Sequence, residues 1–68
     1  MKITLIGLKL KGEIVKAEGE IKEEDFKEIK AFYKEDIWVD DNLIITQNYF
    51  DFVDLQNDYG LKVIKGGL

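Results

Sequence analysis

The chain has 68 residues, of which 46% are hydrophobic and 35% are charged, and it contains no proline or cysteine. It also lacks serine, histidine and arginine, which excludes Ser-His-Asp and Cys-His catalysis, zinc sites built on His or Cys, and bidentate clamping of phosphate by arginine. The formal net charge of −4 disfavours direct binding of nucleic acid, because affinity for phosphate comes from Lys and Arg.

The first predicted element is a β-strand over residues 2–10, in which apolar side chains alternate with one break in phase. The two phases are formed by Ile3 and Leu5 on one side and by Ile6, Leu8 and Leu10 on the other. We place the change of phase beside Gly7, where the missing side chain permits a bulge. Lys11-Gly12 is typical of a tight hairpin turn, and a return strand is predicted over residues 13–20.

A helical period begins at Lys22. Phe26, Ile29 and Tyr33 follow the spacing i, i+3, i+7 and fall within about 60° of arc on a helix. The first turn carries three acidic residues, which the helix dipole favours at that end. Two short β-rich runs follow, over residues 37–39 and 43–46, and the turn formers Asp40-Asp41-Asn42 between them indicate a second hairpin.

Residues 49–59 are predicted to form a second helix. Asn48 is a favourable N-cap, Asp51 takes the capping-box position, and Gly60 stands where a helix ends in the left-handed conformation. A strand is the alternative, since Phe50 and Phe52 flank Asp51 and aromatic residues favour sheets. A last strand is predicted over residues 61–65, followed by a frayed tail over residues 66–68.

These elements predict one α+β domain over residues 1–68, with the order ββα-ββα-β. An antiparallel sheet covered on one face by two helices would bury both apolar stripes, and it leaves the other sheet face as an open question. The longest apolar run, residues 3–8, is far shorter than the roughly 20 residues that span a bilayer. The start of the chain lacks the apolar region of a secretory signal, so we expect a cytoplasmic protein with no membrane partner.

Charge is distributed unevenly along the chain. Residues 1–34 carry eight lysines and seven acids, whereas residues 35–61 carry seven acids and no lysine. On a helix over residues 49–59, Asp51, Asp54 and Asp58 fall within about 60° of one another. The turn residues Asp40 and Asp41 would extend this acidic stripe. It either attracts a cationic partner or only solvates the outer face of the helix.

The aromatic residues also leave two possibilities. Phe52, Leu55 and Tyr59 suit the core, whereas the burial of Trp38, Tyr49 and Phe50 is not determined by the pattern. Exposed aromatics bordered by acids match the composition of protein interfaces. Trp38, Tyr49 and Phe50 are therefore candidate anchors for a partner, with burial in the core or in a dimer interface as the alternative.

No catalytic residue, cofactor or metal site is expected. The residues left for catalysis are carboxylates, lysine, tyrosine and threonine, and the spacing Asp54-x-Gln56-x-Asp58 lacks the glycine and the closing glutamate of a calcium loop. We expect a small acidic module that binds a basic surface of a partner protein, for example a groove that otherwise takes nucleic acid. In size and charge alone the chain resembles compact acidic inhibitor domains carried by phages and other mobile elements. The alternative is a structural module that forms a homodimer through exposed aromatics.

Overall fold

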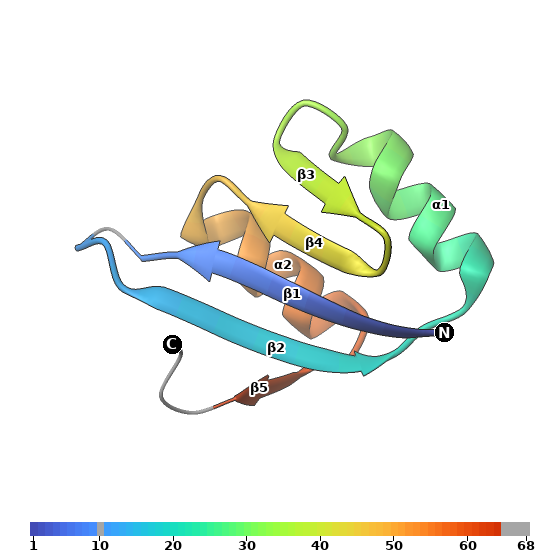
Figure 1. Ribbon diagram of the computed structural model, residues 1–68, viewed down its shortest axis with the longest axis horizontal. Helices are drawn as coiled ribbons and strands as arrows, with labels where there is room; N and C mark the ends of the chain where they lie inside the picture. The colour runs from blue at the N-terminus through green and yellow to red at the C-terminus, as the bar shows by residue number, and fades with distance from the viewer. Residues whose placement is uncertain (10, 65–68) are drawn as a thin grey trace.

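Seven elements follow one another in the computed structural model, which describes residues 1–9 and 11–64 (Figure 1). In chain order they are β1 (Lys2–Leu8), β2 (Ile14–Glu20), α1 (Glu23–Phe32), β3 (Ile37–Asp40), β4 (Leu43–Thr46), α2 (Tyr49–Asp58) and β5 (Lys62–Ile64). The predicted order ββα-ββα-β and the α+β class are confirmed, and the segment that begins at Tyr49 is a helix rather than a strand.

The strands form one sheet in the order β3-β4-β1-β2-β5. Three of the four pairings are antiparallel, as predicted, but β1 and β4 run parallel, with Leu5 opposite Ile44. The parallel pair arises because α1 carries the chain from the end of β2 to the far side of β1, where the second hairpin docks. A crossover through a helix is the usual connection that leads to a parallel strand pair.

α2 packs on one face of the sheet and passes behind β1 in Figure 1, and the buried side chains of α1 belong to the same core, as predicted for two helices on one face. The helices bury Phe26 and Ile29 of α1 together with Phe52 and Leu55 of α2. The sheet contributes the buried side chains Ile3, Leu5, Ala17, Ile37 and Ile44. Because side chains alternate along a strand, the odd-numbered residues of β1 point toward the helices and its even-numbered residues point away from them.

The bulge predicted beside Gly7 is wrong. β1 and β2 pair without an extra residue from Lys2 opposite Glu20 to Leu8 opposite Ile14. The apparent change of phase arises because β1 carries apolar side chains on both faces. Gly7 lies beneath α2 instead, where an added Cβ would stand 2.8 Å from both the Phe52 Cβ and the Thr46 Oγ1. Its missing side chain therefore allows the helix to approach the sheet closely.

Local hydrogen bonds fix both ends of α2. The Asn48 side-chain oxygen accepts a hydrogen bond from the Asp51 backbone N–H at 2.8 Å. The Asp51 carboxylate accepts a bond from the Asn48 side-chain amide at 3.1 Å, whereas in a capping box it would accept from the Asn48 backbone N–H. At the other end Gly60 has a φ of +62°. The Leu61 N–H donates to the Gln56 carbonyl at 2.9 Å and the Gly60 N–H to the Asn57 carbonyl at 3.4 Å, which forms a Schellman motif.

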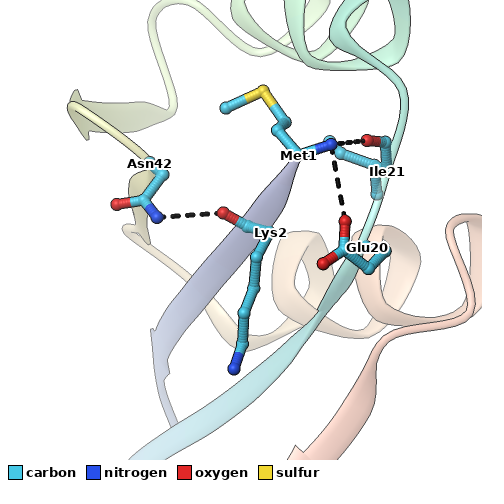
Figure 2. Close-up of polar contacts among 5 residues, drawn as sticks. All are labelled: Met1, Lys2, Glu20, Ile21 and Asn42. Atoms are coloured by element: carbon cyan, nitrogen blue, oxygen red, sulfur yellow. Dashed lines mark hydrogen bonds and ion pairs between the residues drawn. The ribbon is translucent and has the colours of Figure 1, made fainter.

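The start of β1 is held by neighbours on both sides, as Figure 2 shows. The Met1 amino group donates to the Ile21 carbonyl and lies 3.5 Å from a carboxylate oxygen of Glu20. On the opposite side, the Asn42 side-chain amide donates to the Lys2 carbonyl at 2.9 Å. These contacts join β1 to β2 and to the turn between β3 and β4.

The hairpin turns agree with the predicted turn chemistry. Gly12, between β1 and β2, has the expected positive φ of +83°. In the second hairpin Asp40 pairs with Leu43, and Asp41 takes a positive φ of +57°. Leu10, Lys65 and the predicted tail over residues 66–68 lie outside the described residues.

Candidate functional site

The three aspartates of α2 lie along the outer side of the helix. Asp54 and Asp58 are exposed, and Asp51 is half-buried and bonded to Asn48. In residues 1–9 and 11–64 the ion pairs join the Met1 amino group to Glu20 and Lys9 to Glu13, so no described lysine pairs with any of these aspartates. Their negative charge is not neutralised locally.

A shallow groove of about 580 Å³ separates the C-terminal halves of the two helices. It is lined by Glu28, Ile29, Ala31, Phe32, Tyr33, Asp58 and Tyr59. Phe32 is 81% exposed, and its ring packs edge-on against Tyr33 with 5.0 Å between the ring centroids. An exposed aromatic ring and two half-buried tyrosines therefore stand beside carboxylates from both helices.

The tyrosines show that negative charge from both helices acts on this groove. Burial raises the pKa of Tyr33, and the charges of Asp54, Asp58 and Asp51 raise it further. Burial also raises the pKa of Tyr59, with added contributions from Glu28, Asp25 and Asp58. Nearby negative charge disfavours a tyrosinate and favours a cation. The groove is thus an aromatic-lined hollow in a negative field.

We expect the alkaline limit of stability to depend on these two tyrosines. Because their folded pKa values lie above the unfolded value of 10.0, the unfolded chain ionises first as the pH rises. The stabilisation is complete below pH 10.0 and is lost as the pH rises through the folded pKa values. Denaturant unfolding at increasing pH, with tyrosinate absorbance recorded in parallel, measures this loss.

The control is the double variant Tyr33→Phe/Tyr59→Phe, which keeps the rings and removes the titrating hydroxyls. Its stability should fall less steeply above pH 10.0 than that of the unaltered protein. The same alkaline slope in both proteins would contradict the assignment. All other ionisable groups are common to both proteins, so they do not account for a difference between the two slopes.

The predicted anchors lie at two places in the fold, and none of them lines the groove between the helices. Trp38 is 70% exposed on the sheet face that points away from the helices. Tyr49 and Phe50 lie at the start of α2, where Phe50 is 73% exposed and the Lys9 amino group stands 5.7 Å from the Tyr49 ring centroid. A shallow pocket beside the first hairpin includes both residues.

The predicted acids of the second hairpin also stand apart. Asp40 and Asp41 are exposed at the β3–β4 turn, and neither lines the groove between the helices. The aromatic residues that line the groove together with Asp58 are Phe32, Tyr33 and Tyr59. Among the predicted site residues, Asp58 lines this hollow, and Asp54 and Asp51 lie near enough for their charges to raise the pKa of Tyr33 in its wall.

Phe32 and Glu28 were missed by the sequence analysis, although a signal for Phe32 was present. At 100° per residue, Phe32 stands roughly 120° from Phe26 and so falls outside the apolar stripe of α1. An aromatic ring off the stripe of an amphipathic helix is expected to be exposed. Glu28 gave no such signal, because it belongs to the half of the chain in which lysines balance the acids.

The described part of the chain contains no group of three or more acidic side chains arranged to hold a metal ion. Nor does it contain a helix long and apolar enough to cross a membrane. No protein-family model, curated protein or solved structure matches the chain.

Proposed function

We propose that this protein is a non-catalytic binding module whose inter-helix groove and α2 aspartates dock on a basic surface of a partner protein. The observation that carries the proposal is the convergence of unneutralised acids from both helices on a hollow with an exposed aromatic ring. Charge gives such a surface its orientation and association rate, and the aromatic residues supply apolar contact area.

The placement of Asp58 supports a role in recognition. It lies in the last turn of α2, where the helix dipole disfavours negative charge and where the helix carries no basic residue. Asp54 and Asp58 are also like charges at i, i+4, a spacing that costs about 0.2–0.5 kcal/mol. Both effects lower the stability of a domain whose small core leaves little stability to spare. Local rules are most often broken in this way at functional sites.

The groove suits a lysine or arginine side chain of the partner. The aliphatic part of such a side chain packs against the ring of Phe32, while its charged end reaches Glu28 or Asp58. Cations also lie favourably over aromatic faces, as the Lys30 amino group does at 4.9 Å from the Phe26 ring centroid. Basic surfaces of this kind occur on proteins that bind nucleic acid, and the module would inhibit such a partner by covering its phosphate-binding residues.

The test begins with capture of the partner from the native host and its identification by mass spectrometry. Affinity is then compared between the unaltered protein and the double variant Asp54→Asn/Asp58→Asn. We expect about a tenfold loss of affinity and a shallower dependence on salt, because two charges leave the interface. Nucleic acid added as a competitor should displace the module from a nucleic-acid-binding partner.

The matched control is Glu13→Gln/Glu35→Gln, which changes the net charge equally at positions outside the groove. It should bind with nearly unchanged affinity. A second pair separates the aromatic contribution, since Phe32→Ala and Phe50→Ala each remove a ring that is more than 70% exposed, but only Phe32 lines the groove. Full affinity and an unchanged salt dependence of the Asp54→Asn/Asp58→Asn variant would refute the proposal.

A further inference from the structure

The sheet face that points away from both helices carries a continuous row of side chains. Strand register places Trp38 beside Ile45, Ile45 beside Ile6, Ile6 beside Lys16, and Lys16 beside Ile64. This row crosses all five strands of the sheet, and we call the surface that it lies on the uncovered face. No helix in residues 1–9 and 11–64 packs on it (Figure 1).

Apolar side chains are concentrated on the half of the uncovered face formed by β3, β4 and β1. Trp38 is 70% exposed there, and Leu8 and its cross-strand partner Ile14 on β2 are 44% and 39% exposed. Leu43 adds a further apolar side chain beside Thr4. The largest exposed apolar patch of a soluble protein is often an interaction site.

The charges on the uncovered face sum to zero, although the whole chain has a net charge of −4. Strand alternation places three lysines and three acids on it: Lys2, Lys16 and Lys62 with Glu18, Glu20 and Asp40. The helix side of the molecule, in contrast, carries the unneutralised aspartates of α2. Two copies can therefore meet through the uncovered face without net repulsion, and a lysine of one copy can lie opposite an acid of the other.

We infer that the uncovered face is the interface of a symmetric homodimer. The same patch on each copy meets across a twofold axis, with the apolar half nearest the axis. The five strands hold 25 residues, which at about 3.3 Å per residue and about 4.8 Å between strands give a planar area of about 400 Å² per copy. Two copies would bury about 800 Å² in total, less than the roughly 1,200–2,000 Å² of stable specific interfaces, so we expect a weak dimer that forms at high protein concentration.

Sedimentation velocity over a wide concentration range tests the dimer, with tryptophan emission recorded on the same samples. Trp38 is the single tryptophan of the chain, so its emission should shift to shorter wavelength as the dimer forms and water leaves the ring. The Trp38→Ala variant should weaken self-association about tenfold or more, because buried tryptophans dominate interface energetics.

The control is Phe50→Ala, which removes an equally exposed ring at the start of α2 and should leave the dimer unchanged. Circular dichroism verifies that both variants are folded. The groove variant Asp54→Asn/Asp58→Asn should dimerise normally. The experiments therefore test the dimer and the partner-binding proposal separately. A monomer at millimolar concentration with constant tryptophan emission would overturn the inference. So would a dimer that Phe50→Ala or Phe32→Ala dissociates and Trp38→Ala does not.

Discussion

Replacing Asp58 with lysine should make the domain more stable and at the same time abolish its binding to a basic partner. The substitution places a cation in the last turn of α2, where the helix dipole favours it, and changes the i, i+4 repulsion with Asp54 into an attraction in the favourable order. Together these changes should raise the free energy of unfolding by about 1 kcal/mol. Denaturant unfolding measures the gain.

The loss of binding should be much larger than the gain in stability. Asp58 lines the groove, so a lysine there removes an attractive charge and opposes the incoming cation at short range. Like charges placed together across an interface cost several kcal/mol, which corresponds to a loss of affinity of about a hundredfold or more. Titration of the identified partner, at low and at high salt, measures this effect.

Two controls separate stability from recognition. Glu13→Lys makes the same change in net charge at the first hairpin, outside the groove, and should retain most of the affinity. Asp58→Asn removes the unfavourable charge without adding a cation, so its stability and affinity should lie between those of the unaltered protein and those of the Asp58→Lys variant. If Asp58→Lys binds as tightly as the unaltered protein, the groove is not the docking site.

The parts of the fold that depend on local chemistry were predictable. Asn48 and Gly60 mark the ends of α2 because a cap and a left-handed terminator act within a few residues of the chain. The turn of the second hairpin is likewise set by Asp41 and Asn42. The parallel pairing of β1 with β4 was not predictable in this way, since it depends on where α1 delivers the second hairpin.

The acidic part of the candidate site was predictable from the sequence, but its aromatic part was not. Helical spacing placed Asp51, Asp54 and Asp58 on one side of α2, which is a property of that helix alone. Their aromatic neighbours depend on how α1 lies against α2, so Tyr33 and Phe32 could not be assigned to them from spacing. Trp38 was ambiguous for a similar reason. Alternation places Trp38 on the other sheet face from the buried Ile37, but only the packing of the whole sheet shows that no helix of residues 1–9 and 11–64 covers that face.

The two proposed surfaces are compatible because they lie on opposite sides of the molecule. A dimer formed through the uncovered face would leave the helices of each copy pointing outward. It would then present two acidic grooves to a partner. Two linked sites that engage one partner bind more tightly than either site alone, provided that the geometry allows both to dock. A Trp38→Ala monomer should therefore lose apparent affinity for a partner with two basic sites, and retain it for a partner with one.

Replacing Gly7 with alanine should destabilise the domain by about 1–3 kcal/mol, the usual cost of overpacking a core. The new Cβ would stand 2.8 Å from the Phe52 Cβ, which is far inside van der Waals contact. Small domains have few kcal/mol of stability to lose, so this change should lower the denaturation midpoint strongly. Chemical denaturation followed by circular dichroism measures it.

Gly19→Ala is the matched control, because it also adds a methyl group to the helix-facing side of the sheet. Its nearest contact is the Leu61 Cδ2 at 3.0 Å, the end of a side chain that can rotate away. Both substitutions reduce the freedom of the unfolded chain equally, so the difference between them reports the contact alone. Equal stability of the two variants would contradict the close approach of α2.

The nature of the contact at Gly7 also determines whether it can be relieved. The clash involves the Cβ of Phe52, which every residue except glycine has, so a shorter side chain at position 52 would not remove it. The Thr46 hydroxyl would stand equally close to the new methyl group. The variant can fold only if α2 moves away from β1. That movement would carry Asp54 and Asp58 with the helix and change the groove that Asp58 lines together with α1. Gly7→Ala should therefore weaken partner binding even under conditions in which the variant is fully folded, although Gly7 is buried and lies outside the groove.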